Sequence, residues 1–75
     1  MSKKSELEKK IQDGEAEISE LERKRMRSQS AIFAAQLNNT PINETDVEYF
    51  RVFTNLIELK RKEIQQYQTE LNALS

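Results

Sequence analysis

The 75-residue chain contains no cysteine, no histidine and no tryptophan, and it has a single glycine and a single proline. Without cysteine there is no disulfide, no thiolate metal site and no cysteine nucleophile. Without histidine the chain lacks the most common metal ligand and the usual acid–base group at neutral pH. One glycine cannot build a glycine-rich phosphate-binding loop. We therefore expect no enzyme activity, no metal site and no cofactor.

Long hydrophobic runs are also missing. No segment approaches the roughly 20 apolar residues that a membrane-spanning helix needs, and charged residues follow the N-terminus where a signal peptide would have an apolar core. The formal net charge of −1 gives no chain-wide positive charge to attract nucleic acid. These features predict a cytoplasmic protein that does not enter a membrane.

Each half of the chain instead carries a regular apolar stripe, with steps that alternate between three and four residues. The two stripes are mirror images, as the layers of an antiparallel coiled coil require. The first stripe comprises Leu7, Ile11, Gly14, Ile18, Leu21, Arg25, Ser28, Ile32 and Ala35, and the second comprises Phe50, Phe53, Ile57, Lys60, Ile64, Tyr67, Leu71 and Leu74.

A reversal of the chain at residues 42–43 pairs the two stripes layer by layer. Gly14 then faces the bulky Leu71, which offers a reason for a glycine inside a helix. In the same register Arg25 lies opposite Lys60. Such a layer of two cations can fix the register at some cost in stability.

Helix boundaries are marked by capping patterns and by helix breakers. Residues 5–8 (Ser-Glu-Leu-Glu) and 45–48 (Thr-Asp-Val-Glu) are capping boxes. Between them, Pro41 blocks helix continuation, and Asn38 or Asn39 can adopt the left-handed conformation that ends a helix. We therefore predict one all-α domain over residues 1–75, an antiparallel two-helix coiled-coil hairpin with helices over about 5–37 and 46–74 and a loop over about 38–45.

The half nearer the loop carries more apolar residues than one seam can use. In a lone hairpin these residues would be exposed, and large exposed apolar surface usually marks association. A second copy can cover it by closing a four-helix bundle, or a different protein can bind it. The surplus residues are Tyr49, Val52, Leu56 and Leu59 in the second helix and Met26, Phe33 and Leu37 in the first.

In the same antiparallel register, basic residues from both helices lie at the same level along the hairpin. Concentrated positive charge can bind a phosphate backbone, but no aromatic residues interleave for base stacking. The structural alternative is that these cations form ion pairs with neighbouring glutamates and set the register. The possible anion-binding belt comprises Arg23, Lys24, Arg25, Arg27, Lys60, Arg61 and Lys62.

In pattern, the chain resembles the small bacterial and phage hairpins that dimerise into four-helix bundles. That resemblance implies a homodimer, which would also cover the surplus apolar residues. We predict a non-catalytic protein that acts through protein–protein contact, as an assembly, adaptor, chaperone or regulatory module. The alternative is a nucleic-acid-binding four-helix bundle that uses the basic belt.

Overall fold

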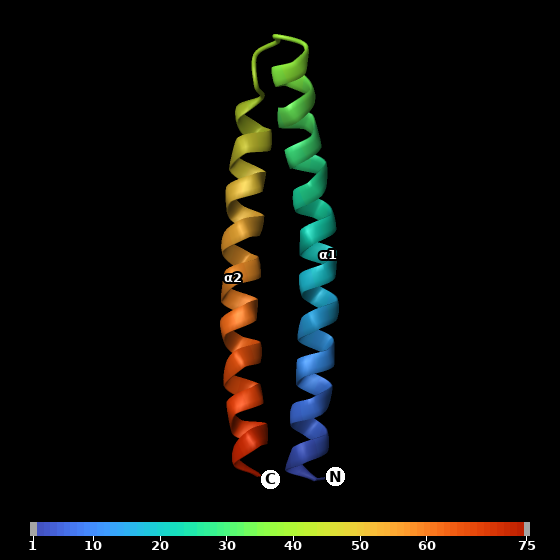
Figure 1. Ribbon diagram of the computed structural model, residues 1–75, viewed down its shortest axis with the longest axis vertical. Coiled ribbons are helices and arrows are strands. Elements are labelled where there is room, and N and C mark those ends of the chain that lie inside the picture. Colours follow the sequence, from blue (N-terminus) through green and yellow to red (C-terminus); the bar gives the residue numbers. More distant parts are fainter. Residues whose placement is uncertain (1, 75) are drawn as a thin grey trace.

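The computed structural model describes residues 2–74 and consists of two antiparallel α-helices that lie side by side (Figure 1). Helix α1 spans Lys3–Leu37 and helix α2 spans Glu44–Ala73. The molecule is a slender rod of 55 × 16 × 14 Å, with the loop at one end. The predicted all-α helical hairpin is confirmed. Over residues 2–74, neither helix is long and apolar enough to cross a membrane.

Both helices begin two residues before their predicted starts. Ser2 caps α1, and its side-chain oxygen accepts a hydrogen bond from the Ser5 backbone N–H at 3.2 Å. Asn43 caps α2, and its Oδ1 accepts a hydrogen bond from the Thr45 backbone N–H at 2.8 Å. Serine and asparagine are both favoured N-caps. Each helix therefore starts at a capping residue that precedes the predicted box.

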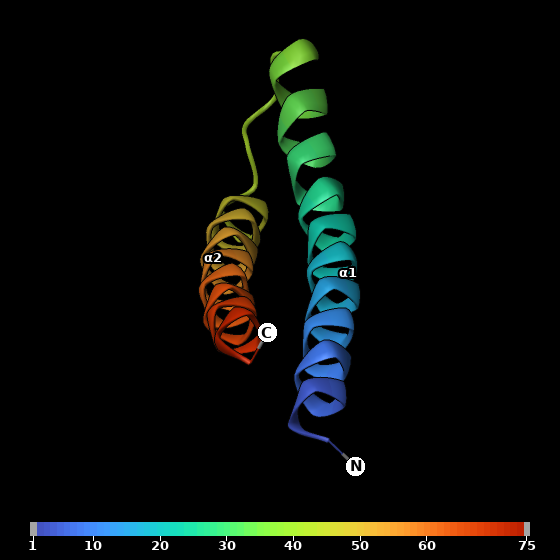
Figure 2. The ribbon, with the colours of Figure 1, turned by 60° about the horizontal axis from the view of Figure 1, so that its bottom comes forward.

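Helix α1 ends in a Schellman motif. Asn39 has a left-handed φ of 53°, as predicted for one of the two asparagines. The Thr40 N–H donates to the Ala35 carbonyl at 2.9 Å, and the Asn39 N–H donates to the Gln36 carbonyl at 3.3 Å. Residues 40–43 then run back beside the end of α1, so that α2 begins below the top of α1 (Figure 2). The chain thus reverses at Asn39.

This early reversal displaces the helices by one heptad from the predicted register. A β-carbon added at Gly14 would lie 2.8 Å from Cγ1 of Ile64, so Gly14 faces Ile64 and not Leu71. The predicted register was wrong because it placed the reversal near the end of the extended segment 40–43. An extended residue advances about 3.3 Å, against 1.5 Å in a helix. The returning segment therefore covers the last turns of α1 before α2 begins.

The hydrophobic core lies away from the loop. We call residues 2–21 and 57–74 the open-end half of the hairpin, and residues 22–56 the loop-end half. Every buried apolar residue of the described chain belongs to the open-end half, whereas the one buried residue of the loop-end half is Ser28. The buried apolar residues are Leu7, Ile18, Ile57 and Ile64.

Candidate interaction surface

The loop-end half exposes large apolar side chains. Of the ten exposed large apolar residues in the described chain, eight lie within residues 22–56. All seven surplus residues predicted from the sequence are among the ten, with exposed fractions from 40% for Val52 to 71% for Leu37. Contiguous apolar surface on a small protein marks an interaction site more often than a free surface.

Three of the ten exposed apolar residues were not predicted to be exposed. Sequence reasoning missed Ile42 and Val47, because one lies in the loop and the other in the first turn of α2, where few neighbouring positions reveal a periodic pattern. Leu74 was assigned to the seam but is 51% exposed. The one-heptad displacement explains this correction, because it carries Leu74 past Leu7, the first apolar residue of the α1 seam.

The seven surplus residues form two stripes on opposite sides of the hairpin, and all of them except Leu59 belong to the loop-end half. The α2 stripe is Tyr49, Val52, Leu56 and Leu59, and the α1 stripe is Met26, Phe33 and Leu37. Tyr49 shares a shallow hollow with Lys24 and Arg27, which come one position before seam residues of α1. The α1 stripe lines a different hollow, formed by α1 alone. Because Met26 and Phe33 come one position after seam residues, they lie on the other flank of the seam.

The upper end of the α2 stripe is fixed by aromatic packing. The ring of Tyr49 stacks on Phe53, with centroids 6.0 Å apart and an interplanar angle of 25°. Phe53 is half-buried in the seam, next to the buried Ser28. The α2 stripe therefore begins on a side chain that the hairpin itself holds in place, and an orientation fixed in advance reduces the entropy cost of binding.

Arg25 and Lys60 do not form the predicted two-cation layer. Arg25 Nη1 donates to Thr54 Oγ1 at 3.4 Å, and its guanidinium carbon lies 5.8 Å from the centroid of the Phe50 ring. The layer was predicted for the wrong register, in which α2 stands one heptad from its observed position. In the observed register Arg25 is half-buried against aromatic and hydroxyl groups, and like-charge repulsion in the seam is avoided.

Lys60 belongs instead to a polar network in the open-end half. Its Nζ lies 2.7 Å from Glu17 Oε2 and 3.6 Å from Glu63 Oε1. The hydrogen bond to Glu17 raises the pKa of Lys60, and the negative charges of both glutamates act in the same direction. The Tyr67 hydroxyl donates to Glu63 Oε1 at 3.2 Å, and partial burial followed by the charge of Glu63 raises the pKa of Tyr67.

The remaining belt cations are divided between ion pairs and open surface. Arg23 pairs with Glu20 at 3.7 Å, and Arg61 pairs across the helices with Glu22 at 3.8 Å. Lys24 and Arg27 lie beside Tyr49, and Lys62 lies on the outer face of α2 among glutamine side chains. The seven residues therefore do not form one continuous positive belt at a single height.

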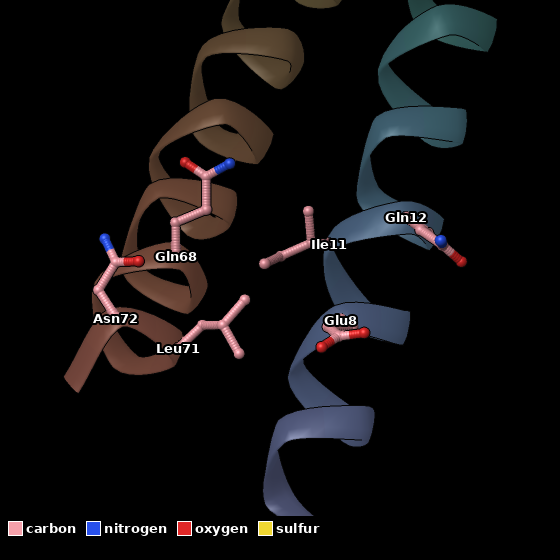
Figure 3. Close-up of a pocket in the computed structure, with 6 residues that line it drawn as sticks. All are labelled: Glu8, Ile11, Gln12, Gln68, Leu71 and Asn72. Atoms are coloured by element: carbon pink, nitrogen blue, oxygen red, sulfur yellow. The ribbon is translucent and has the colours of Figure 1, made fainter. Parts of the chain in front are cut away.

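A hollow near the open end offers no catalytic arrangement. Ile11 and Leu71 point toward one another between the helices, and polar side chains surround them (Figure 3). Among the described residues, Glu8 is the only titratable one that lines it, whereas acid–base catalysis needs converging groups. Within residues 2–74, no three acidic side chains come close enough together to hold a metal ion.

No protein-family model, curated protein or solved structure matches this chain significantly. Its function is therefore inferred from the surface that the chain itself presents.

Proposed function

We propose that this chain is a non-catalytic interaction hairpin that binds other protein chains, including copies of itself, through the apolar side chains of its loop-end half. The proposal rests on one observation, that the buried and the exposed apolar residues lie mostly in different halves of the hairpin. The buried ones lie in the open-end half, and eight of the ten large exposed ones lie in the loop-end half. Burial of apolar surface is the dominant favourable term in most protein association.

The small core supports self-association as the form of this contact. Four apolar residues are buried in the described chain, and a single core in a chain of this size rarely supplies more than about 3–5 kcal/mol. A second hairpin adds about 25 cal/mol for each Å² of apolar surface that it covers. We therefore propose a dimer that closes a four-helix bundle. The apolar stripe that the dimer leaves uncovered is then available to a different protein.

Nucleic-acid binding is the second candidate, and one observation favours it. Lys24 and Arg27 lie beside the exposed ring of Tyr49 in one shallow hollow, and proteins that bind single strands combine cations with aromatic rings in this way. The other belt cations weaken this candidate, because Arg23 and Arg61 pair with glutamates. The net charge of −1 also gives no long-range attraction for a phosphate backbone.

Photo-crosslinking from defined positions tests the proposal. A photoreactive amino acid at Phe33 or Leu56 would sit on the proposed surface, and the same group at Asp13 or Gln66 provides controls on exposed polar positions of the open-end half. In extracts of the source cells, we expect adducts with protein from the first two positions and few from the controls. Equal adducts from all four positions would contradict the proposal.

The same experiment separates the two candidates. A photoreactive group at Lys24 lies beside the hollow that favours nucleic acid. Adducts with RNA or DNA from this position, together with no protein adducts from Phe33 or Leu56, would replace the proposed function by nucleic-acid binding.

A further inference from the structure

We infer that the α2 stripe binds the α2 stripe of a second copy of this chain, with the two α2 helices antiparallel and a two-fold axis beside Thr54 and Asn55. This inference rests on the proposed function, because it names the partner and the geometry for the same surface. It follows from the spacing of the stripe, from the charges beside it and from the position of α1 behind it.

The spacing of the α2 stripe is self-complementary. Its steps of three, four and three residues read the same in both directions. In an antiparallel pair, Tyr49 faces the partner's Leu59 and Val52 faces the partner's Leu56, and the two-fold axis repeats both contacts. These four side chains are 40% to 62% exposed in the single hairpin. The surface therefore offers four apolar layers to a copy of itself.

The residues that flank the stripe favour the antiparallel orientation. Glu48 and Asn55 come one position before stripe residues, and Lys62 continues this row at the next heptad. In an antiparallel pair this row faces itself, so Glu48 meets the partner's Lys62 and Asn55 meets its own copy near the axis. A parallel pair would instead place Glu48 against Phe53 and Lys62 against Tyr67. Opposite charges therefore meet in the antiparallel pair and not in the parallel one.

The neighbouring flank of α1 fits the same axis. The hydrogen bond from Arg25 to Thr54 places this level of α1 beside the proposed axis. A two-fold rotation there brings Glu20 of one copy toward Arg27 of the other. In the single hairpin Glu20 forms an exposed pair with Arg23 at 3.7 Å. Exposed ion pairs contribute little to stability, so little is lost when Glu20 exchanges Arg23 for Arg27 of the second copy. The α1 stripe lies on the opposite side and stays uncovered.

Sedimentation equilibrium of the full chain tests which stripe is covered. We expect a dimer at micromolar concentration. Val52→Glu combined with Leu56→Glu should raise the dimer Kd at least about tenfold, because it places like charges against one another in two of the apolar layers. Met26→Glu combined with Phe33→Glu makes the matched change on the α1 stripe, and we expect it to leave the Kd within about twofold.

Charge reversal tests the orientation. Lys62→Glu opposes the partner's Glu48 with a like charge at two symmetry-related places, and we expect the Kd to rise about fivefold. Glu48→Lys should also raise the Kd, and it breaks in addition the exposed pair of Glu48 with Arg51 in the same helix at 2.6 Å. The combined variant should restore most of the affinity. Lys9→Glu, an exposed reversal in the open-end half, is the control for net charge. Asn55→Cys should form a disulfide between chains on oxidation, whereas Glu15→Cys should not.

Several outcomes would overturn the inference. They are a chain that remains monomeric at about 100 μM, a dimer that tolerates Val52→Glu with Leu56→Glu, and a combined charge variant that binds no better than the single ones. The proposed function fails separately. A monomer that captures a different protein from position 56 defeats only this inference, whereas an absence of protein adducts at Phe33 and Leu56 defeats the proposed function.

Discussion

The two halves of the hairpin use their apolar residues in opposite ways. In the open-end half, isoleucine and leucine side chains fill the space between the helices, and Ile18, Ile57 and Ile64 form the core cluster. In the loop-end half, Arg25 and Ser28 occupy seam positions of α1, while apolar side chains point to the surface. The open-end half therefore holds the two helices together, and the loop-end half has unburied apolar surface for a second chain.

The polar seam explains why the loop-end half does not form a core of its own. Phe50 and Phe53 reach the seam from α2 but stay half-exposed. The residues of α1 at this level are Arg25, which interacts with Thr54 and Phe50, and the small Ser28. A short hydroxyl and a guanidinium leave less apolar surface to pack than leucine or isoleucine would. Association can supply what this seam lacks.

Among the changes that test the contrast between the two halves, removal of a core side chain should have the largest effect on the free energy of unfolding. Ile57 is 2% exposed, and Ile57→Ala should lower the free energy of unfolding by about 2–5 kcal/mol. Ile32→Ala removes the same atoms from a half-buried seam position in the loop-end half, so we expect less than half of that loss. Urea unfolding followed by circular dichroism at one protein concentration measures both.

The contrast between the halves would break if Ile32→Ala destabilised the chain as much as Ile57→Ala. That result would place a second core beside the loop. The apolar surface of the loop-end half would then no longer be needed to explain its stability.

Replacement of the polar seam residue Arg25 should change the free energy of unfolding by less, and in the opposite direction. Arg25→Leu replaces a half-buried guanidinium by an apolar side chain beside Phe50. Such replacements are often stabilising, and we expect the free energy of unfolding to rise by about 1 kcal/mol. Arg23→Leu is the control, because the Arg23 side chain is 72% exposed, and its effect should stay within about 0.5 kcal/mol. A loss of stability in Arg25→Leu would mean that the contacts with Thr54 and Phe50 stabilise the seam more than apolar packing does.

The smallest expected effect is an alkaline sensitivity confined to the open-end half. The pKa values of Lys60 and Tyr67 are both raised in the folded chain, so the native state holds these protons more tightly than the unfolded chain. Their contribution to stability is fully present below the unfolded values of about 10 and is lost as the pH rises through the folded values. A variant with Lys60→Met and Tyr67→Phe should therefore show a smaller fall in Tm than the parent between about pH 8 and 11. If Tm fell equally in the two proteins, the sensitivity to alkaline pH would come from other lysines.

Local features of the hairpin could be predicted because their causes are local. A helical stripe follows from the spacing of apolar residues, and the left-handed turn at Asn39 follows from the side-chain preferences of that conformation. The seven surplus residues could be placed off the seam by the same periodicity, and the structure leaves all of them exposed. Which of the two stripes a second chain covers is not a local property, and it stays a proposal.

By itself the sequence determined that two helices form, where they break and which side of each faces the other, because helical periodicity and chain breakers act over a few residues. Only the tertiary structure decided which layers meet. A heptad pattern still places apolar residues against apolar residues after a shift of seven positions, so the stripes alone did not distinguish the two registers. The turn at Asn39 and the return of residues 40–43 along α1 selected one of them. That selection brings Gly14 against Ile64 and Lys60 against Glu17.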